Sequence, residues 1–382
     1  MRKENWTYKK LGEVATITMG QSPTSDTYNE SEGLPFFQGN ADFGKLHPNV
    51  RIYCNAPIRI ADNDDVLISV RAPIGAINIA DRKCCIGRGL AAIRGNEKSQ
   101  SRFIYYLLLA SKDKLVAQGT GSTFKSIGKD ALYNLLMPFV SLATQSRIVS
   151  ELDLLQSIID KQKTQLKELD NLAQAIFYDM FGDPVENEKG WEVKKIEEIC
   201  SSIVRGPFGS ALKKEFFVKP DETTYKVYEQ KHAIQKNASI GDYYISEERF
   251  RTLKRFEVRS GDIIMSCSGT IGEFFEIPID AEKGLMNQAL LKFTLNQRID
   301  KSYFLFTMEF VKNSFEKKGS GLQNIGSVGT VKSTLISLPP LPLQQSFAQK
   351  VESIERQKEL INQSIREAQT LFDSRMEYYF GE

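Results

Sequence analysis

The stretch IVSELDLLQSIIDKQKTQLKELDNLAQAIFYDM, from Ile148 to Met180, decides the fold of this chain. Apolar residues recur in it at alternating spacings of four and three, and Gln162 fills one slot of the pattern. Neither Pro nor Gly interrupts this heptad stripe, which predicts a long helix packed along one partner helix. The residues expected in the seam are Leu152, Leu155, Ile159, Leu166 and Leu169.

A second stretch, from Phe347 to Tyr379, carries the same stripe 199 residues further on (347 − 148). Its polar positions Lys358 and Arg375, like Gln162, are of the kind that fixes register in coiled coils. Two such helices lying antiparallel would bury both stripes, so we predict an antiparallel coiled coil. In the second helix the expected seam residues are Val351, Ile354, Ile361, Ile365 and Phe372.

The repeat extends beyond the two helices. The blocks WTYKKLGEV (6–14), DVLISVRAPIG (65–75) and GSTFKSIG (121–128) recur in the same order as WEVKKIEEI (191–199), DIIMSCSGTIG (262–272) and GSGLQNIG (319–326). Internal duplication of this kind predicts two copies of one structural unit. We expect a globular domain at 1–142, a long helix at 143–182, a linker and second globular domain at 183–342, and a second long helix at 343–382.

The globular parts read as mixed α/β (α+β) domains. Short apolar runs bounded by Gly, Pro, Asn and Asp predict strands at 65–70, 76–79, 90–93, 263–265 and 290–294. Longer apolar runs predict helices at 102–116 and 303–315. The predicted fold is therefore two α/β domains in tandem repeat, each followed by a long helix.

The composition is that of a globular protein. The 382 residues are 41% hydrophobic and 26% charged, with a formal net charge of +2, which allows nucleic-acid binding without requiring it. No apolar run could span a bilayer, and the first residues, MRKENW, lack the apolar segment of a secretory signal. Five cysteines, an odd number without metal-ligand spacing, favour a reduced cytoplasmic setting.

Catalytic motifs are weak. The segment from Gly119 to Ser126 resembles a phosphate-binding loop, but Phe124 occupies a required glycine position and a helix precedes it. Asp221, Glu229 and Lys231 match a short metal-nuclease pattern. In the alignment of the two halves, residues 228–233 lie opposite residues 36–41, with Gln230 opposite Gln38. Residues 36–41 contain neither an acidic residue nor a lysine, so the pattern is not repeated in the first half. No methyl-transfer motif is visible. We expect no catalytic residue, no metal and no cofactor, and we interpret His47 and His232 as surface or loop residues.

The candidate DNA contacts are polar residues at positions where the two repeats align but carry different side chains. Amide and basic side chains read base edges, and loop tips and basic runs contact phosphates. The first half offers Gln38, Asn40, Arg71, Ser122 and Lys125. The second half offers Gln230, Lys231, Arg249, Arg251, Lys254, Gln323 and Asn324.

The whole chain resembles the specificity (S) subunits of type I restriction-modification systems. The resemblance lies in the duplicated order of the blocks above, in LPFFQGN (34–40), and in PPLPLQQ (339–345) leading into the second long helix. The sequence departs from the family at Gln344, where members often have Glu, and at Ala143-Thr-Gln145.

In this family each globular part is a target recognition domain for one half of a bipartite double-stranded DNA site, and the helices act as a ruler between the half-sites. The helices also dock methyltransferase subunits, usually two, and endonuclease subunits join the complex. The resemblance thus implies a non-catalytic DNA specificity subunit reading an asymmetric target. The alternatives are the recognition region of a stand-alone restriction nuclease or methyltransferase, and a structural coiled-coil adaptor. Metal-dependent cleavage of DNA by the isolated chain would favour the stand-alone enzyme over the specificity subunit. A lack of DNA affinity would favour the structural adaptor.

Overall fold

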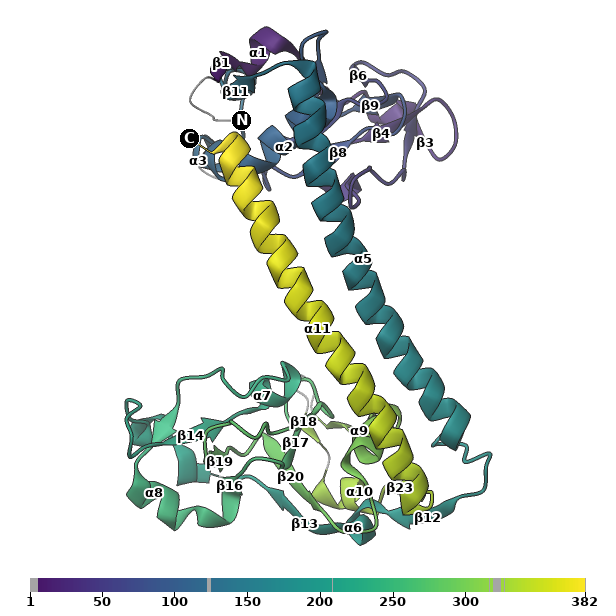
Figure 1. Ribbon diagram of the computed structural model, residues 1–382, viewed down its shortest axis with the longest axis vertical. Coiled ribbons are helices and arrows are strands. Elements are labelled where there is room, and N and C mark those ends of the chain that lie inside the picture. The colour runs from purple at the N-terminus through teal and green to yellow at the C-terminus, as the bar shows by residue number, and fades with distance from the viewer. Residues whose placement is uncertain are drawn as a thin grey trace. The chain divides into compact units, whose positions relative to one another are not determined.

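A computed structural model describes residues 6–121, 125–207, 209–315, 317–318, 324–325 and 327–381 (Figure 1). The chain divides into two compact units. Unit 1 comprises Met1–Gln165 and Ile361–Glu382, and unit 2 comprises Leu166–Leu360. Two 40-residue helices, α5 (Leu142–Phe181) and α11 (Leu341–Phe380), cross the boundary, so each unit contains a segment of both. Each unit is described by itself.

The globular part of unit 1 combines short strands with four short helices. Its elements are β1 (Thr7–Lys10), α1 (Leu11–Val14), β2 (Ala15–Met19), η2 (Ser25–Thr27), β3 (Tyr28–Asn29), β4 (Leu34–Phe37), η3 (Asn40–Asp42), β5 (Tyr53–Cys54), β6 (Ile60–Ala61), β7 (Val66–Ser69), β8 (Ile77–Ile79), β9 (Cys84–Ile86), β10 (Leu90–Gly95), α2 (Ser101–Ala110), α3 (Lys112–Ala117), α4 (Lys129–Tyr133) and β11 (Leu136–Phe139).

Two larger sheets, the antiparallel pair of β1 and β11, and the short helices make up the described residues of this part. One sheet has the antiparallel order β2-β10-β7-β8, and the other has the order β3-β5-β4-β9-β6, in which β4 and β9 run parallel. Val66 and Ile68 of β7 belong to the core that includes α2, whereas Leu67 belongs to a second core that includes β4 and β9. Alternate residues of one strand thus serve two cores, which is why β7 reads as a continuous apolar run.

Unit 2 repeats this arrangement. Its elements are β12 (Glu192–Lys195), α6 (Ile196–Ile199), β13 (Cys200–Arg205), η4 (Gly209–Leu212), η5 (Lys214–Phe216), β14 (Tyr225–Tyr228), α7 (Gln230–Ile234), β15 (Tyr244–Ile245), α8 (Glu247–Thr252), η6 (Lys254–Phe256), β16 (Glu257–Val258), β17 (Ile263–Ser266), β18 (Phe274–Glu276), β19 (Gly284–Met286), β20 (Leu290–Leu295), α9 (Lys301–Val311), η7 (Lys312–Ser314), β21 (Lys317–Lys318), β22 (Asn324–Ile325), α10 (Val328–Ser333) and β23 (Leu335–Leu338).

The two larger sheets of unit 2 have the orders β13-β20-β17-β18 and β15-β14-β19-β16, and β12 pairs with β23 as β1 pairs with β11. The larger sheets match those of unit 1, without a counterpart of β3 in the described residues. As in β7, alternate residues of β17 enter two cores, Ile263 and Met265 on one side and Ile264 on the other. Asp300 caps α9 by accepting from the backbone amides of Ser302 (2.8 Å) and Tyr303 (3.3 Å). The predicted fold of two tandem α/β domains, each followed by a long helix, is confirmed.

Two predicted helices are shorter than expected. The helix at 102–116 is broken at Ser111, whose φ of −91° and ψ of 6° lie in the bridge region between helical and extended backbone. The chain therefore forms α2 and α3 in its place. The helix at 303–315 ends at Val311 and tightens into the short 3₁₀ turn η7, which is a common way for a helix to end.

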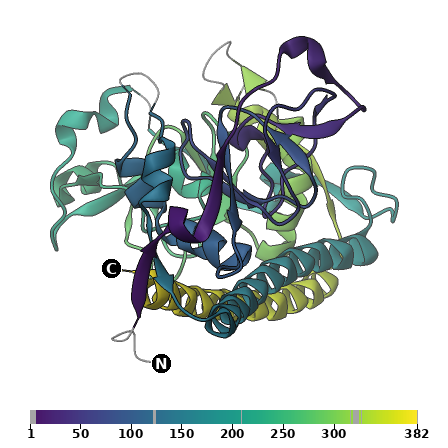
Figure 2. The same ribbon diagram turned by 90° about the horizontal axis from the view of Figure 1, so that it is seen from above.

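Within unit 1, α5 and α11 run antiparallel. Glu151 pairs with Arg375 (2.8 Å), and eleven residues later on α5 the side chain of Gln162 bonds to Ser364, which lies eleven residues earlier on α11. Trp6 stacks on Tyr379 at a centroid distance of 6.2 Å, so the end of α11 also packs on the start of the chain. Figure 2 shows α5 and α11 side by side.

The expected seam residues of unit 1 differ in burial. Leu152 and Ile159 are fully buried, Phe372 is 5% exposed, and Leu155, Ile361 and Ile365 are half-buried.

Within unit 2, Asp170 of α5 pairs with Lys358 of α11 (2.8 Å), and Phe177 and Phe181 of α5 both contact the ring of Phe347 on α11. The expected seam residues here are Leu166 and Leu169, both half-buried, and Val351 and Ile354, both buried.

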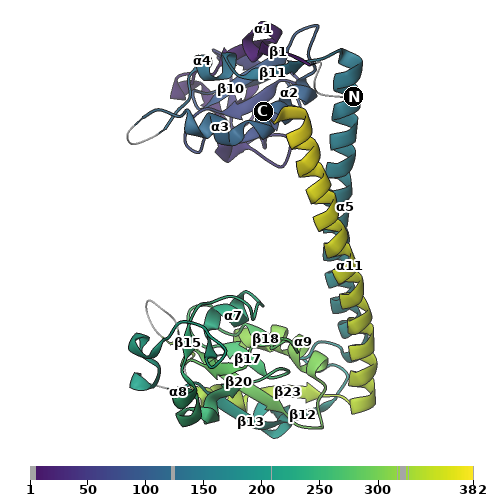
Figure 3. The ribbon, with the colours of Figure 1, turned by 60° about the vertical axis from the view of Figure 1, so that its left-hand side comes forward.

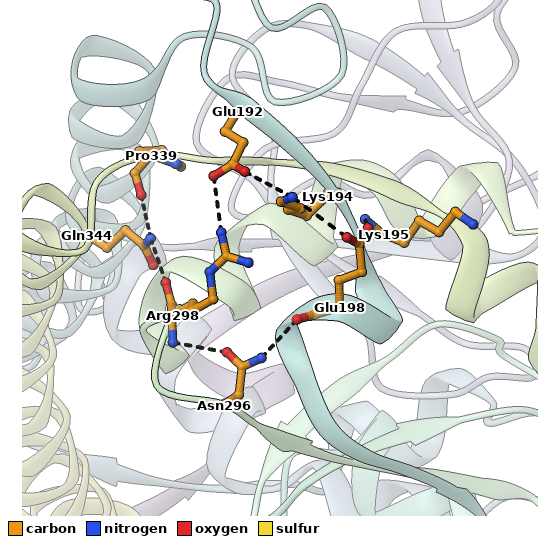
Figure 4. A network of polar contacts seen from close by, with 8 residues as sticks. All are labelled: Glu192, Lys194, Lys195, Glu198, Asn296, Arg298, Pro339 and Gln344. Carbon is orange, nitrogen blue, oxygen red and sulfur yellow. Dashed lines mark hydrogen bonds and ion pairs between the residues drawn. The ribbon is translucent and has the colours of Figure 1, made fainter.

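A fully buried glutamine joins each long helix to its globular part. In unit 2, Gln344 accepts from the backbone amide of Asp300 (2.8 Å) and donates to the carbonyl oxygens of Pro339 (2.7 Å) and Arg298 (3.4 Å). Figure 4 shows that this contact continues through Arg298 to Glu192 (3.2 Å) on β12. The junction therefore links α11, the loop before α9 and the first strand of the unit.

The equivalent glutamine in unit 1 makes the same bonds. Gln145 accepts from the backbone amide of Gln100 (2.9 Å) and donates to the carbonyl oxygens of Lys98 (2.8 Å) and Val140 (3.0 Å). The residues at which the sequence departs from the family pattern thus have one structural role in both halves.

Candidate nucleic-acid interface

In unit 1 the strands end at one shared edge. β10 begins at Leu90 beside the ends of β7 and β2, since Leu90 pairs with Ser69 and Ala91 pairs with Met19. The parallel strands β4 and β9 end together, where the amide of Gly87 donates to the carbonyl oxygen of Phe37 at 2.8 Å. The loops that follow β2, β4, β7 and β9 therefore meet at this edge.

We call this surface the first loop edge, which comprises residues 20–22, 38–40, 70–73, 87–89, 119–121 and 125–127. The last segment joins it through a bridge between Arg71 and Ser126 and through the amide of Ile127, which donates to Val70 (3.0 Å). Four predicted DNA-contact residues meet here. Gln38, Arg71 and Lys125 are exposed, and Asn40 is half-buried.

The first loop edge also contains polar residues that the sequence patterns do not single out. Arg88 is exposed, and its amide donates to Ser22 Oγ at 3.3 Å. Gln21 is exposed, and its amide donates to Ile86 at 3.0 Å. The available signal was Gly87-Arg-Gly89, because two glycines between consecutive strands allow close backbone approach. A Cβ on Gly89 would lie 2.4 Å from the carbonyl oxygen of Gln38.

Basic residues lie at both edges of the sheets of unit 1. Arg71, Arg88 and Lys125 at the first loop edge form no ion pair with any residue that the structure describes. Arg82 pairs with Asp81 (2.8 Å), and its hydrogen bond to that carboxylate lowers the pKa of Asp81. Because Arg82 lies between the end of β8 and the start of β9, it belongs to the opposite edge of the sheets. Three exposed cations without an ion pair among the described residues thus lie at the first loop edge, and others, such as Lys83, lie elsewhere on unit 1.

Unit 2 has an equivalent surface, which we call the second loop edge: residues 206–207, 229–231, 267–271 and 287–289. The amide of Gly206 donates to Leu290 (3.0 Å), that of Asn287 to Tyr228 (2.9 Å) and that of Cys267 to Ala289 (2.7 Å). Figure 3 shows β17 and β20, two of the strands that meet there.

The second loop edge contains Gln230 and Lys231, both half-buried, and Lys231 pairs with Glu229 (2.7 Å). One further basic side chain flanks this edge. Arg205, at the end of β13, donates to the carbonyl oxygen of Gln288 (3.3 Å). The two edges therefore share a backbone framework but differ in their side chains.

The structure corrects the alignment of the two halves at this point. The sequence alignment places Tyr228 opposite Phe36 and Gln230 opposite Gln38. The amide of Gly87 bonds to Phe37 as that of Asn287 bonds to Tyr228, so Tyr228 is instead the counterpart of Phe37. One extra residue then separates β4 from the helical turn that follows, and the counterpart of Gln230 is Asn40, the first residue of η3.

Three basic candidates of unit 2 lie apart from Gln230. β15 ends beside the start of β14, so α8, which follows β15, begins at the opposite end of the sheet. Arg249 donates to the carbonyl oxygen of Ala211 (2.7 Å) and stacks on Phe216 (4.0 Å), so its charge is engaged internally. Arg251 pairs with Glu247 (2.8 Å), and Lys254 is exposed on η6, which contacts β19.

Three candidates fall in or beside segments that the structure does not describe. Ser122 and Gln323 lie outside the described residues. The backbone of Asn324 pairs with that of Lys318 in the ribbon of β21 and β22.

Burial limits the reactivity of one histidine and of three cysteines. His47 is exposed in a loop, as predicted, whereas the prediction for His232 is wrong: it lies in α7 and is fully buried. Burial raises the pKa of the Cys84, Cys200 and Cys267 thiols to about 12, far above the range in which thiolates act as nucleophiles.

The nuclease-like residues are also accounted for locally. Asp221 is exposed and accepts from the hydroxyl (2.8 Å) and amide (2.7 Å) of Thr223, which lowers its pKa. Among the described residues, no three His, Cys, Asp or Glu side chains are grouped to hold a metal ion. No helix in the described part of the chain is long and apolar enough to cross a membrane.

Comparison with known proteins gives one consistent family. A family model described as "Type I restriction modification DNA specificity domain" matches residues 3–171 and 188–370. The type I restriction enzyme MjaIX specificity subunit of Methanocaldococcus jannaschii is 22% identical over 384 residues, covering 92% of this chain and 87% of that one. A candidate MjaX specificity subunit of the same organism is 41% identical over 177 residues, which span 45% of this chain and 42% of that protein.

A solved structure extends the similarity to the fold. The crystal structure of the type I restriction-modification S subunit from M. genitalium superposes with a TM-score of 0.60 at 15% identity, covering 99% of this chain and 96% of that one. At this level of identity the match bears on the fold alone.

Proposed function

Because the chain belongs to the type I restriction modification DNA specificity family, we propose that it is the DNA specificity subunit of a type I restriction-modification complex and that it reads a bipartite, asymmetric target. One loop edge would bind each half-site. The subunit is non-catalytic, so methylation and cleavage belong to its partner subunits. We assign the recognition domains to residues 1–142 and 183–342, and the spacer helices to residues 143–182 and 343–382.

The observation that carries this proposal is that the two loop edges have the same backbone arrangement but different side chains. Asn40 and Gln230 occupy equivalent positions and carry the amide groups that bond adenine bidentately in the major groove. Arg71 has Ser268 as its counterpart, and Arg88 has Gln288. Two edges with the same geometry and different donors and acceptors would recognise two different sequences, which is what an asymmetric bipartite target requires.

Affinity and specificity would come from different residues. The exposed cations Arg71, Arg88 and Lys125 suit phosphate contacts, which supply salt-dependent affinity and fix register. The amides of Gln21, Gln38 and Asn40 suit base edges, which supply sequence discrimination.

The long helices also support the proposed partners. In unit 1, Leu154 is 62% exposed and Ile158 is 37% exposed on α5, and in unit 2, Leu360 is 68% exposed on α11. Leu154 and Ile158 lie one turn apart on the same face of α5, and grouped exposed apolar side chains of this kind suit a protein–protein contact. We propose that methyltransferase subunits, two in number, dock on these helices and that endonuclease subunits join the complex. The five unpaired cysteines agree with a cytoplasmic location.

The test is methylation mapping by single-molecule sequencing in cells that carry this chain and its methyltransferase subunit. We expect one bipartite motif with a fixed unread gap, methylated once on each strand. A continuous motif would contradict reading by two edges, and the absence of any motif would contradict the function.

Replacing Arg71 with alanine should weaken DNA binding about tenfold and make the affinity less dependent on salt, since one phosphate contact contributes roughly one unit to the salt slope. The measurement is fluorescence anisotropy with a target duplex over a series of salt concentrations. Arg82→Ala is the matched control, because Arg82 lies at the opposite edge and pairs with Asp81. Equal losses in the two variants would remove Arg71 from the interface.

A further inference from the structure

In both units a buried side chain caps the turn that carries the amide residue. Asp42, 3% exposed, accepts from the backbone amides of Gln38 (2.7 Å) and Gly39 (3.3 Å). His232, fully buried, accepts at Nδ1 from the backbone amide of Glu229 (2.8 Å). Each is the third residue of the helical turn that follows β4 or β14, so the two side chains are structural counterparts.

These caps determine where the loop backbone lies at each edge. The capped residues lie directly beside Asn40 and Gln230, the equivalent amides of the two loop edges. In unit 1 the cap is further held by Arg51, whose Nε donates to Asp42 at 2.8 Å. In unit 2 the Nε2 of His232 lies 2.7 Å from the carbonyl oxygen of Ile240, which ties the turn to the loop before β15.

The hydrogen bonds assign the neutral tautomer of His232. Nδ1 accepts from an amide, so the single proton is on Nε2, which donates to Ile240. A second proton would have to sit on Nδ1, which could then no longer accept from Glu229 and would instead face its carbonyl oxygen at 3.0 Å. Protonation therefore exchanges the bonding partner of the cap and leaves the amide of Glu229 without its acceptor.

The surroundings of His232 favour the neutral ring. Burial lowers the pKa of His232 below the ordinary value of 6.5, and the charge of Lys226 on β14 acts in the same direction. The carboxylate of Glu229 and the backbone hydrogen bonds act in the opposite direction. Lys226 itself pairs with Glu282 (3.0 Å).

The strands β17 and β18, which pack against α7, present carboxylates that are already paired. Glu273 beside β18 pairs with Lys236 (3.7 Å) and Lys312 (2.9 Å), and Glu276 on β18 pairs with Lys301. Because an opened turn would bind a proton that the capped turn does not, the cap loses stability as the pH falls below 6.5.

We propose that Asp42 and His232 are positioning residues for the two loop edges and that the imidazole makes recognition of one half-site, and only that one, sensitive to mild acid. This inference rests on the proposed function. Histidine is the side chain whose ordinary pKa lies in this range, and the chain has only two. The other, His47, has its Nδ1 2.8 Å from the carbonyl oxygen of Ile79 at the end of β8, at the edge of the sheet opposite the first loop edge.

The experiment uses the full chain in complex with its methyltransferase subunit and three fluorescent duplexes: the mapped target, the target with one half-site scrambled, and the target with the other scrambled. Anisotropy at constant salt gives the discrimination at each half-site. Between about pH 7.5 and pH 5.5 we expect discrimination at the half-site read by unit 2 to fall about tenfold, the effect of losing one set of base-edge bonds, and discrimination at the other to change less than about twofold.

Two variants test the assignment. His232→Asn keeps an acceptor at the place of Nδ1 but does not titrate, so its discrimination at the half-site read by unit 2 should be the same at both pH values. His47→Gln is the matched control and should follow the wild type. Because His232→Asn could fold poorly, the wild-type chain labelled with ¹³C at histidine Cε1 provides a second measurement: its two NMR signals are assigned with His47→Gln, and the His232 signal should shift in the pH range where discrimination falls.

Two results would overturn the inference. Parallel loss at both half-sites would contradict it, as would unchanged discrimination at the half-site read by unit 2. Failure of the proposed function is distinguishable, because the complex would then not prefer the mapped target even at pH 7.5, and the inference would fall with it.

Discussion

Replacing Phe177 with alanine should lower the free energy of unfolding by about 3–5 kcal/mol, the usual cost of removing a fully buried aromatic side chain. Phe177 lies on α5 in unit 2, is fully buried, and contacts five aromatic rings at centroid distances of 5.1–5.9 Å: Phe181, Tyr303, Phe306, Phe310 and Phe347. Urea unfolding followed by circular dichroism measures the change.

The matched control is Leu172→Ala on the same helix. Leu172 is 47% exposed, so its loss should change the free energy of unfolding by less than about 1 kcal/mol. Equal effects of the two substitutions would contradict the view that Phe177 anchors α5 to the globular part of unit 2. Because Tyr303, Phe306 and Phe310 lie on α9 and Phe347 lies on α11, this single ring joins three helices.

Inserting seven residues into both long helices should lengthen the unread gap of the DNA target by about three base pairs and leave both half-sites unchanged. The insertions would follow Gln165 in α5 and Leu360 in α11, at the boundary between the units. Seven residues keep the heptad in phase and add about 10 Å of helix, against 3.4 Å for each base pair. Methylation mapping of the variant measures the gap.

The control for this prediction is an insertion into α5 alone. It would shift contacts such as Glu151–Arg375 and Asp170–Lys358 out of register with one another, so this variant should lose stability and give no new fixed gap. Altered half-sites in the double insertion would contradict the role of the helices as a ruler. A related exchange, replacing residues 8–138 with those of another recognition domain, should change only one half-site.

Sequence alone predicted the features that depend on local periodicity and repetition. The heptad stripes and duplicated blocks predicted two long helices and two mixed α/β domains, because a 3.6-residue period and a repeat are both visible in one dimension. Four of the predicted DNA-contact residues of unit 1 meet at one edge because each follows a strand or a glycine-bounded turn, which the sequence also marks.

Features that depend on distant neighbours were not predictable. Arg249 looked like part of a basic surface, but its partner Ala211 is 38 residues away in the sequence. The sequence predicts a surface or loop position for His232. The prediction fails because the burial of this ring depends on the loop that carries Ile240. The extra residue after β4 is invisible in sequence because the alignment keeps a glutamine in both halves, and only the hydrogen bond from Gly87 to Phe37 shows the shift.

The glutamine junctions have a consequence for how such proteins change over time. Gln145 and Gln344 each accept a hydrogen bond from one backbone amide and donate hydrogen bonds to two backbone carbonyl oxygens. A junction that depends on main-chain atoms places few demands on the side chains of the globular part that it joins. Genetic recombination with crossovers at the start of either long helix could therefore exchange a whole globular part between related genes in one event, without new mutations at the junction.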